Sequence, residues 1–474
     1  MIPRVMSTQH PDNVSIPFFA RAPDMGGEDE ITEAFYAFSV LGAEEQMWDF
    51  EGKEVDEFVV KKLFERYPDF FSRVRLGRDV RLTPRVPNPS VERAEAKLLL
   101  ETLETIPRSA DYARLFYGEE VAPMFEVILP MTTSSAELNR VYQLYGRYIV
   151  GRQYKRVYDV KLYEWIGRFY PEEISVIPLF ETREAILNAE KIVREYIADK
   201  ELEHQRVFLA RSDPAMNYGL ISAVIYDKFA LYGLQKLSEE TGIEIYPIIG
   251  VGGPPFRGHF TPENVEAVLR EYPSVQTFTV QSSFKYDRPA KEVIQAIEVV
   301  KSSKRGRAEE IPEDVLQLLE KYIERYSKEV KALAPFIREV AKHVPSRRRR
   351  RLHIGLFGYS RKVNGSALPR AIKFTASLYS LGIPPELLGL SALSEGELDL
   401  LSDYYINLYD DLAFAFRYFN PRVVERFPFL KPLVRIAKDY ERDERHGEIT
   451  TKILKGELSE TLIVEAAGIR GFLG

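Results

Sequence analysis

The feature that most constrains the fold of this 474-residue chain is a recurring pair of segments, one short and apolar, the next longer with helical periodicity. The short segments are rich in β-branched residues and end in polar ones. Eight parallel strands, each followed by a helix, are typical of a closed (β/α)8 barrel of the α/β class, and an open doubly wound sheet is the alternative. The eight segments span residues 46–52, 80–86, 126–131, 175–181, 207–213, 244–250, 276–281 and 352–358.

Further helical stretches lie outside this alternation. One covers residues 28–41, before the first predicted strand, and another is inserted at 312–342. From residue 368 onward the helical pattern continues without a linker-like break, so we expect residues 368–474 to pack on the barrel. Length alone allows about three domains. The pattern instead predicts one TIM-barrel catalytic domain over residues 1–474, with additional N-terminal, inserted and C-terminal helices.

Charge and composition exclude several kinds of site. The formal net charge of −6 gives no overall attraction to nucleic acid or to an anionic membrane. The absence of cysteine excludes disulfides, thiolate zinc sites, iron–sulfur clusters and cysteine nucleophiles, which leaves carboxylates and six histidines as metal ligands. No apolar stretch of about 18 residues lacks charges, and no apolar signal segment opens the chain. We therefore expect a cytoplasmic protein that binds neither nucleic acid nor membrane.

Polar residues recur at the ends of the predicted strands, where a barrel enzyme collects its chemistry. Glu181 and Asp213 end neighbouring strands and could bind Mg²⁺ or Mn²⁺, which prefer oxygen ligands. Taken singly, each carboxylate could instead be only the N-cap of the next helix. Arginines could hold a phosphate or carboxylate through paired hydrogen bonds, although Arg85 alone could also be a surface ion pair. The other strand ends supply Glu51, Arg211, Gln281, Ser282 and Arg361.

A run of five arginines covers residues 347–351. Such a run could indicate nucleic-acid binding, which keeps a noncatalytic RNA-binding protein as an alternative function. The chain is acidic overall, however, and no stacking aromatic residues are interleaved with these arginines. We therefore expect a solvated segment or a contact between subunits.

Several motifs, taken together, resemble the phosphoenolpyruvate carboxylase family, specifically its short archaeal type. The segment VIPLFET at residues 176–182 is very similar to a family motif that contains a metal-binding glutamate. This motif is quite specific, whereas the others are weaker and gain weight from their shared order along the chain. They are STQHPD around His10, ARSD at 210–213, the glycine loop at 250–258, FKY at 284–286 and AAGIR at 466–470.

The resemblance implies the irreversible carboxylation of phosphoenolpyruvate with bicarbonate to oxaloacetate and inorganic phosphate, with Mg²⁺ or Mn²⁺ as cofactor. It makes Glu181 and Asp213 the metal ligands. In the family's scheme bicarbonate attacks phosphorus, which gives carboxyphosphate and a metal-stabilised pyruvate enolate. His10 then acts as the base on carboxyphosphate, and Arg257 neutralises the transferring phosphoryl oxygens. The resemblance also implies a homotetramer. Another Mg-dependent barrel lyase acting on pyruvate or phosphoenolpyruvate stays open as an alternative.

The chain departs from the family's pattern where positive charge is expected. Val251 replaces the first arginine of the glycine loop, and Met216 replaces a lysine that follows the metal-binding aspartate. The missing charge must come from elsewhere in the chain. We expect substrate to be bound by Arg85, Arg211, Gln281, Ser282 and Arg361.

Overall fold

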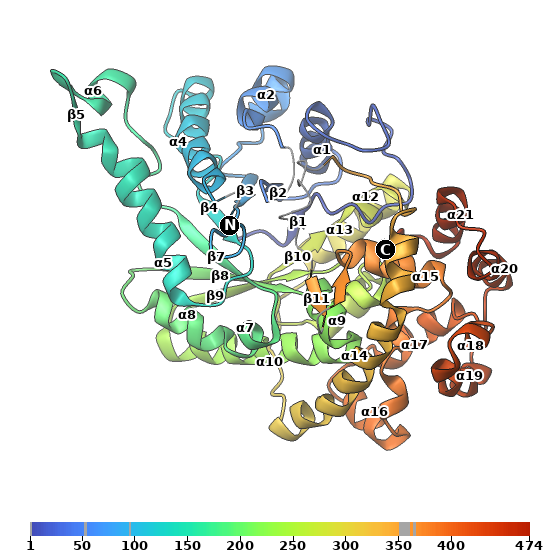
Figure 1. The fold of residues 1–474 in the computed structure, drawn as a ribbon. Coiled ribbons are helices and arrows are strands. Elements are labelled where there is room, and N and C mark those ends of the chain that lie inside the picture. Colours follow the sequence, from blue (N-terminus) through green and yellow to red (C-terminus); the bar gives the residue numbers. More distant parts are fainter. Residues whose placement is uncertain (1, 52–54, 94–95, 350–360, 364–365) are drawn as a thin grey trace.

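The computed structural model describes residues 2–51, 55–93, 96–349, 361–363 and 366–474, and eight of its strands form a closed parallel barrel (Figure 1). Each strand pairs with the next around the ring in the order β1-β10-β9-β8-β7-β4-β3-β2. The expected (β/α)8 barrel is therefore confirmed. Its strands are β1 (Val5–Ser7), β2 (Glu45–Asp49), β3 (Arg81–Arg85), β4 (Glu126–Leu129), β7 (Ser175–Phe180), β8 (His204–Ala210), β9 (Glu244–Gly250) and β10 (Thr277–Val280).

One barrel strand differs from the sequence prediction. Seven predicted segments overlap the seven barrel strands other than β1. The eighth, 352–358, lies outside the described residues. The ring closes instead through β1, which pairs in parallel with β10 at Val5↔Phe278 and with β2 at Met6↔Glu45. The prediction of an eighth strand at 352–358 is thus wrong for the barrel. A three-residue strand is too short to show a periodicity in the sequence.

Two kinds of packing fill the barrel. An apolar cluster occupies its interior, and a buried ionic cluster closes the end where the strands begin. There Arg206 donates to Glu45 and Glu126 at 2.7 to 2.9 Å, and Arg81 reaches Glu126 at 3.0 Å. The opposite end, where the strands finish, is the open one. The apolar cluster consists of Met6, Met47, Ile128, Ile177, Leu179, Phe208, Ala210 and Ile248.

Helices surround the barrel, and the segments after β7 and β8 each contain two helices. The first pair is separated at Asn188, and the second at Gly219, whose φ of 86° favours glycine. The surrounding helices are α1 (Glu28–Ser39), α2 (Val59–Arg66), α3 (Pro68–Phe71), α4 (Leu98–Tyr117), α5 (Ser135–Gln143), α7 (Arg183–Leu187), α8 (Ala189–Ile197), α9 (Ser212–Tyr218), α10 (Leu220–Thr241), α11 (Val265–Glu271), α12 (Ser282–Tyr286), α13 (Ala290–Ser302) and α14 (Glu313–Ala341).

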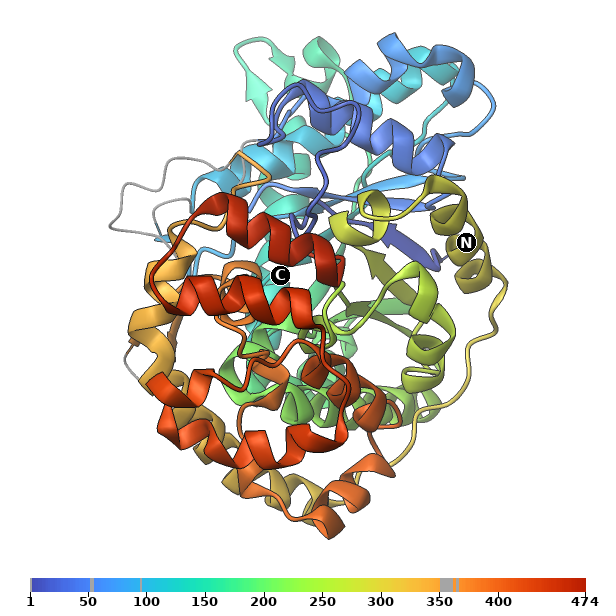
Figure 2. The ribbon, with the colours of Figure 1, turned by 90° about the vertical axis from the view of Figure 1, so that its right-hand side faces the viewer.

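The C-terminal part is helical and lies against the barrel, with the C-terminus near the middle of that face (Figure 2). Its first helix contacts α9, α14 and α21, which joins the tail to the layer around the strands. No helix among the described residues is long and apolar enough to cross a membrane. The helices are α15 (Ala371–Ser380), α16 (Glu395–Ser402), α17 (Leu408–Arg417), α18 (Val423–Arg426), α19 (Lys431–Ile436), α20 (Glu444–Leu454) and α21 (Glu460–Arg470).

One segment projects away from the body of the molecule (Figure 1). It continues α5 through the π-helix η2 (Leu144–Val150) and the 3₁₀-helix η3 (Gly151–Tyr154). A small hairpin of β5 (Arg156–Val157) and β6 (Val160–Lys161) follows, and α6 (Leu162–Ile166) leads back. We refer to residues 144–168 as the arm.

Candidate active site

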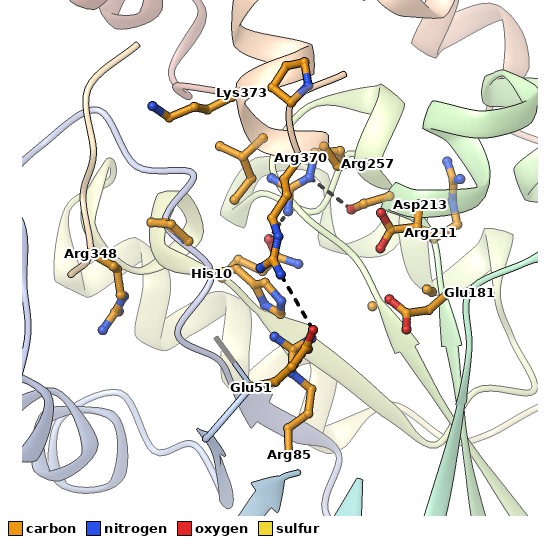
Figure 3. A pocket seen from close by; sticks show the side chains of 18 of the residues that line it. His10, Glu51, Arg85, Glu181, Arg211, Asp213, Arg257, Arg348, Arg370 and Lys373 are labelled. Carbon is orange, nitrogen blue, oxygen red and sulfur yellow. Dashed lines mark hydrogen bonds and ion pairs between the residues drawn. The ribbon is translucent and has the colours of Figure 1, made fainter. Parts of the chain in front are cut away.

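A cavity of about 290 Å³ opens at the ends of the barrel strands (Figure 3). The carboxylates of Glu181 and Asp213 lie on one side of it, while His10 lies near its centre and Arg348 on the far side. Residues from distant parts of the sequence therefore meet in one space. Seven of the nine predicted site residues line the cavity: His10, Arg85, Glu181, Arg211, Asp213, Arg257 and Gln281.

His10 reaches the cavity because it follows β1. The backbone oxygen of His10 accepts a hydrogen bond from the N–H of Ser282 at 3.2 Å, and its ring Nδ1 lies 2.9 Å from Thr8 Oγ1. His10 thus stands at a strand end like the other site residues. Its position relative to a strand was missed in the sequence because β1 itself was missed.

The two predicted metal ligands come from neighbouring strands. Glu181 directly follows β7, and its Oε2 accepts the backbone N–H of Met131 at 2.6 Å. Met131 has a φ of 53°, which is uncommon for a residue with a side chain and directs this N–H toward Glu181. Asp213 lies in the first turn of α9, just after β8. Both carboxylates line the cavity.

These carboxylates fit a divalent cation that shares its coordination with substrate. Among the described residues, no group of three or more His, Cys, Asp or Glu side chains could hold a metal ion by itself. Mg²⁺ commonly binds through one or two carboxylates and keeps waters or substrate oxygens as its remaining ligands. The donor set of Glu181 and Asp213 therefore suits Mg²⁺ or Mn²⁺ rather than a metal enclosed by protein.

Arg257 is held by several partners at once. Its guanidinium donates to Ser212 at 3.0 Å, to Gln281 at 2.5 Å and to Asp12 at 3.2 Å, and it also reaches the backbone oxygen of Gly474 at 2.7 Å. Burial lowers the pKa of Arg257, and the charge of Asp12 partly offsets this. The side chain is therefore rigidly placed at the cavity wall.

Arg85 is also buried, and its charge is already compensated. Two parallel hydrogen bonds of 2.7 Å join it to Asp49, and Glu51 lies 3.2 Å from its Nε. Burial alone would lower the pKa of Arg85, but these two carboxylates outweigh it and raise the pKa. The reading of Arg85 as a surface ion pair is thus wrong about its exposure, since the pair is buried.

Arg211 lines the cavity wall, but its charged neighbours lie toward the surrounding helices. Burial would lower its pKa, yet Tyr272 and Asp227 raise it overall. Its guanidinium donates a hydrogen bond of 3.5 Å to the backbone oxygen of Pro255. Nothing in these contacts directs the Arg211 guanidinium toward Glu181 or Asp213.

A sequence model of the phosphoenolpyruvate carboxylase family matches residues 2–474. The chain belongs to this family. Proteins named phosphoenolpyruvate carboxylase from Pyrococcus abyssi, Pyrococcus furiosus and Methanothermobacter thermautotrophicus are 63%, 60% and 55% identical to it, and each alignment covers all of both chains. A solved malate synthase from Haloferax volcanii is 10% identical, with a TM-score of 0.40 over 72% of this chain and 90% of that one.

Of the two remaining predicted site residues, Ser282 does not line the cavity, and a role of Arg361 in substrate binding stays a prediction. Ser282 begins α12, and it contributes the backbone N–H that binds His10. Arg361 opens the short strand β11 (Arg361–Val363), and its side chain lies outside what the structure describes.

The cavity is also lined by four basic residues that were not predicted to belong to the site. Arg370 and Lys373 belong to the start of α15, and Arg370 lies 3.7 Å from Glu51. Arg347 and Arg348 are buried, so the expectation of a solvated segment at 347–351 is wrong for these two residues. Their burial also removes the main support for RNA binding through this run.

The residues that allow these cations to be buried are present in the sequence, but they lie far from the cations along the chain. Arg348 can be buried because Glu33 and Glu30 of α1 accept its hydrogen bonds at 2.6 and 3.2 Å. These partners lie more than 300 positions earlier in the chain, so no local pattern connects them. The four basic residues together add positive charge to the cavity wall.

Proposed function

We propose that this chain carboxylates phosphoenolpyruvate with bicarbonate and releases oxaloacetate and inorganic phosphate. The observation that carries the proposal is the composition of the cavity: a histidine, two carboxylates on one side and a basic wall, in a member of the phosphoenolpyruvate carboxylase family. Both substrates are anions, which a basic wall attracts and holds. The carboxylate pair supplies the cation site that such substrates share with protein.

Glu181 and Asp213 would hold Mg²⁺ or Mn²⁺ in this cavity. When bound, the cation would supply Lewis-acid stabilisation of negative charge on the substrate. The protein would fix Glu181 through the Met131 N–H and Asp213 through the first turn of α9. Neither carboxylate then needs to reorganise during the reaction.

The basic residues would neutralise the phosphoryl group during its transfer. An oxygen of bicarbonate attacks phosphorus, the bond from phosphorus to the enolate oxygen breaks, and carboxyphosphate forms. Arg257 is rigidly held and lies at the cavity wall, while Arg370 extends from α15 toward Glu51 above His10. Arginine suits this work because its fixed fork matches phosphate geometry.

His10 would then take the proton of carboxyphosphate. Loss of that proton lets the bond from carbon to the bridging oxygen break, which yields CO₂ and inorganic phosphate. The enolate carbon attacks CO₂ and forms oxaloacetate. The imidazole side chain is suited to accept and release a proton near neutral pH. The contact of Nδ1 with Thr8 fixes the orientation of the ring.

The test is a coupled assay of the purified protein with phosphoenolpyruvate, bicarbonate and Mg²⁺, in which malate dehydrogenase reports oxaloacetate. We expect product only when both bicarbonate and a divalent cation are present. A reaction that proceeds without bicarbonate would instead favour another lyase of pyruvate or phosphoenolpyruvate, and no product would contradict the proposal. The homotetramer implied by the family resemblance stays a prediction.

A further inference from the structure

The arm, residues 144–168, exposes large apolar side chains. Tyr158 is 98% exposed, Trp165 is 68% exposed and Tyr148 is 67% exposed. Clustered exposed aromatic residues of this kind mark interaction surfaces in folded proteins. The other large apolar side chains exposed on the arm are Tyr154, Val157 and Ile166.

The rest of the chain supports the arm at its base, where Tyr145, Ile149 and Val150 pack into the core, and much less toward its exposed tip. Its base is fixed to α4 by an ion pair of 2.6 Å between Arg152 and Glu104. Farther out, β5 pairs with β6, and within the described residues neither belongs to a larger sheet. A two-stranded hairpin on its own is marginally stable in water. A partner that covers the aromatic residues would stabilise it.

The arm is also basic, although the whole chain carries a net charge of −6. Its only acidic residues are Asp159 and Glu164. A basic surface on an acidic protein predicts an acidic partner. The basic residues of the arm are Arg147, Arg152, Lys155, Arg156, Lys161 and Arg168, and all except Arg152 are exposed.

A surface of complementary character lies on the same chain, around α16 and the start of α17. Residues 391–411 contain six acidic residues and no lysine or arginine. Leu400, Ile406 and Tyr409 are exposed among them. We call this surface the acidic patch; its exposed acidic residues are Glu395, Asp399, Asp403 and Asp410.

The arm and the acidic patch lie at opposite ends of the molecule in both views (Figures 1 and 2). The arm therefore does not reach the patch of its own chain. Two copies placed side by side in opposite directions would bring each arm to the patch of the other, which closes a twofold pair. We propose that the arm docks on the acidic patch of a second copy of this chain.

This inference adds a contact surface to the expected homotetramer and does not depend on the proposed reaction. Basic residues interleaved with aromatic ones can also bind single-stranded RNA. The acidic patch favours the second copy because it offers both the opposite charge and exposed apolar side chains, which a nucleic acid does not.

A charge-exchange experiment tests the contact. One variant reverses the arm with Lys155→Glu, Arg156→Glu and Arg168→Glu. A second reverses the patch with Glu395→Lys, Asp403→Lys and Asp410→Lys. All six side chains are exposed. A matched control reverses Lys304 and Glu309, two exposed residues of the loop before α14. Sedimentation of the full chain is measured at about 0.15 M salt for each variant and for an equimolar mixture.

We expect each reversed variant alone to sediment as a smaller species than the wild type, with self-association weakened at least about tenfold. The mixture should restore the wild-type species, because each contact then joins opposite charges again, and the control should match the wild type. The proposal would be overturned if the wild type sediments as a monomer or if the reversed variants sediment like the wild type. It would also be overturned if the mixture does not restore the wild-type species. Salt-sensitive binding of single-stranded RNA that disappears only in the arm variant, with assembly unchanged, would reassign the arm.

Discussion

His10 lies near the centre of the cavity, so substitution of this residue tests its proposed role in proton transfer. For His10→Asn we expect oxaloacetate formation to fall about 100-fold or more, the range that a lost general base produces. Bicarbonate-dependent phosphate release should fall much less, because attack on phosphorus does not require this base. Parallel assays of phosphate and oxaloacetate check the ratio.

His204→Asn is the matched control, because His204 begins β8 at the opposite end of the barrel. This substitution should leave the ratio of the two products unchanged. Equal losses of phosphate and oxaloacetate in His10→Asn would remove His10 from the carboxylation step.

We expect the stability of the protein to depend on pH because of the buried side chain of His446. It is fully buried in α20, and burial, reinforced by the nearby charge of Arg470, lowers its pKa to about 3. The unfolded chain takes up this proton near pH 6.5 and the folded chain does not, so the contribution to stability is lost as pH falls from about 6.5 toward 3.

His446→Gln removes this titration and retains a polar group near Arg470. We expect the difference in unfolding free energy between wild type and variant to shrink steadily as pH falls from about 7 to about 4. Urea unfolding across this range measures it. A difference that does not change with pH would contradict a neutral, buried His446.

At this scale the sequence predicted chemistry better than orientation. Glu181 and Asp213 could be named because each follows a strand whose end faces the barrel mouth. Arg211 was named for the same reason, but the groups that raise its pKa are Tyr272 and Asp227, not the carboxylates of Glu181 and Asp213. The direction of a long side chain depends on partners distant in sequence, which no local pattern reveals.

Among the elements, a buried ionic cluster joins α1 and α12 to the segment that carries Arg348. Glu33 of α1 accepts hydrogen bonds from Lys285 at 2.8 Å and from Arg348 at 2.6 Å. Lys285 also donates to the backbone oxygen of Thr8 at 2.8 Å, two residues before His10. Burial alone would raise the pKa of Glu33, but the two cations outweigh it and hold the pKa at about 2. The cluster therefore fixes both the cavity wall and the His10 loop.

Glu33→Gln would leave two buried cations without their shared carboxylate. We expect a loss of about 3 to 5 kcal/mol in unfolding free energy, the usual cost of breaking a buried ion pair from one side. Calorimetry or urea unfolding measures this loss. Glu324→Gln, which breaks an exposed pair with Lys328 on α14, is the control and should be nearly neutral. An unchanged unfolding free energy in Glu33→Gln would contradict a stabilising role for this cluster.

Element prediction succeeded where segments were long and failed where they were short. The seven barrel strands other than β1 carry four to seven residues, and each was found near its predicted place. The three residues of β1 gave too little pattern, so the barrel was completed with 352–358 in the prediction. Closure of the ring is a property of all eight strands together, and the structure shows that β1 provides it.

For the whole molecule, the C-terminal helices contribute to the site and do more than cover the barrel. Arg370 and Lys373, which line the cavity, come from the start of α15, more than 350 residues after His10. The sequence predicted that the tail packs on the barrel. It did not predict this contribution to the cavity, because the placement of α15 follows from packing between remote elements.

Arg370→Gln should raise the KM for phosphoenolpyruvate by about 10-fold to 100-fold, the equivalent of one lost charge-assisted hydrogen bond. Steady-state kinetics at saturating bicarbonate measures the change. Arg349→Gln is the control, since Arg349 is exposed and pairs with Asp24 outside the cavity. An unchanged KM would remove Arg370 from substrate binding.

In the proposed reaction, the cavity directs bicarbonate onto phosphorus before carbon is joined to carbon. The most direct measurement uses bicarbonate labelled with ¹⁸O in all oxygens and follows the label by mass spectrometry after one turnover. If bicarbonate attacks phosphorus, we expect one labelled oxygen in the inorganic phosphate and two in the new carboxylate of oxaloacetate. Phosphate without label from bicarbonate, formed together with oxaloacetate, would contradict it.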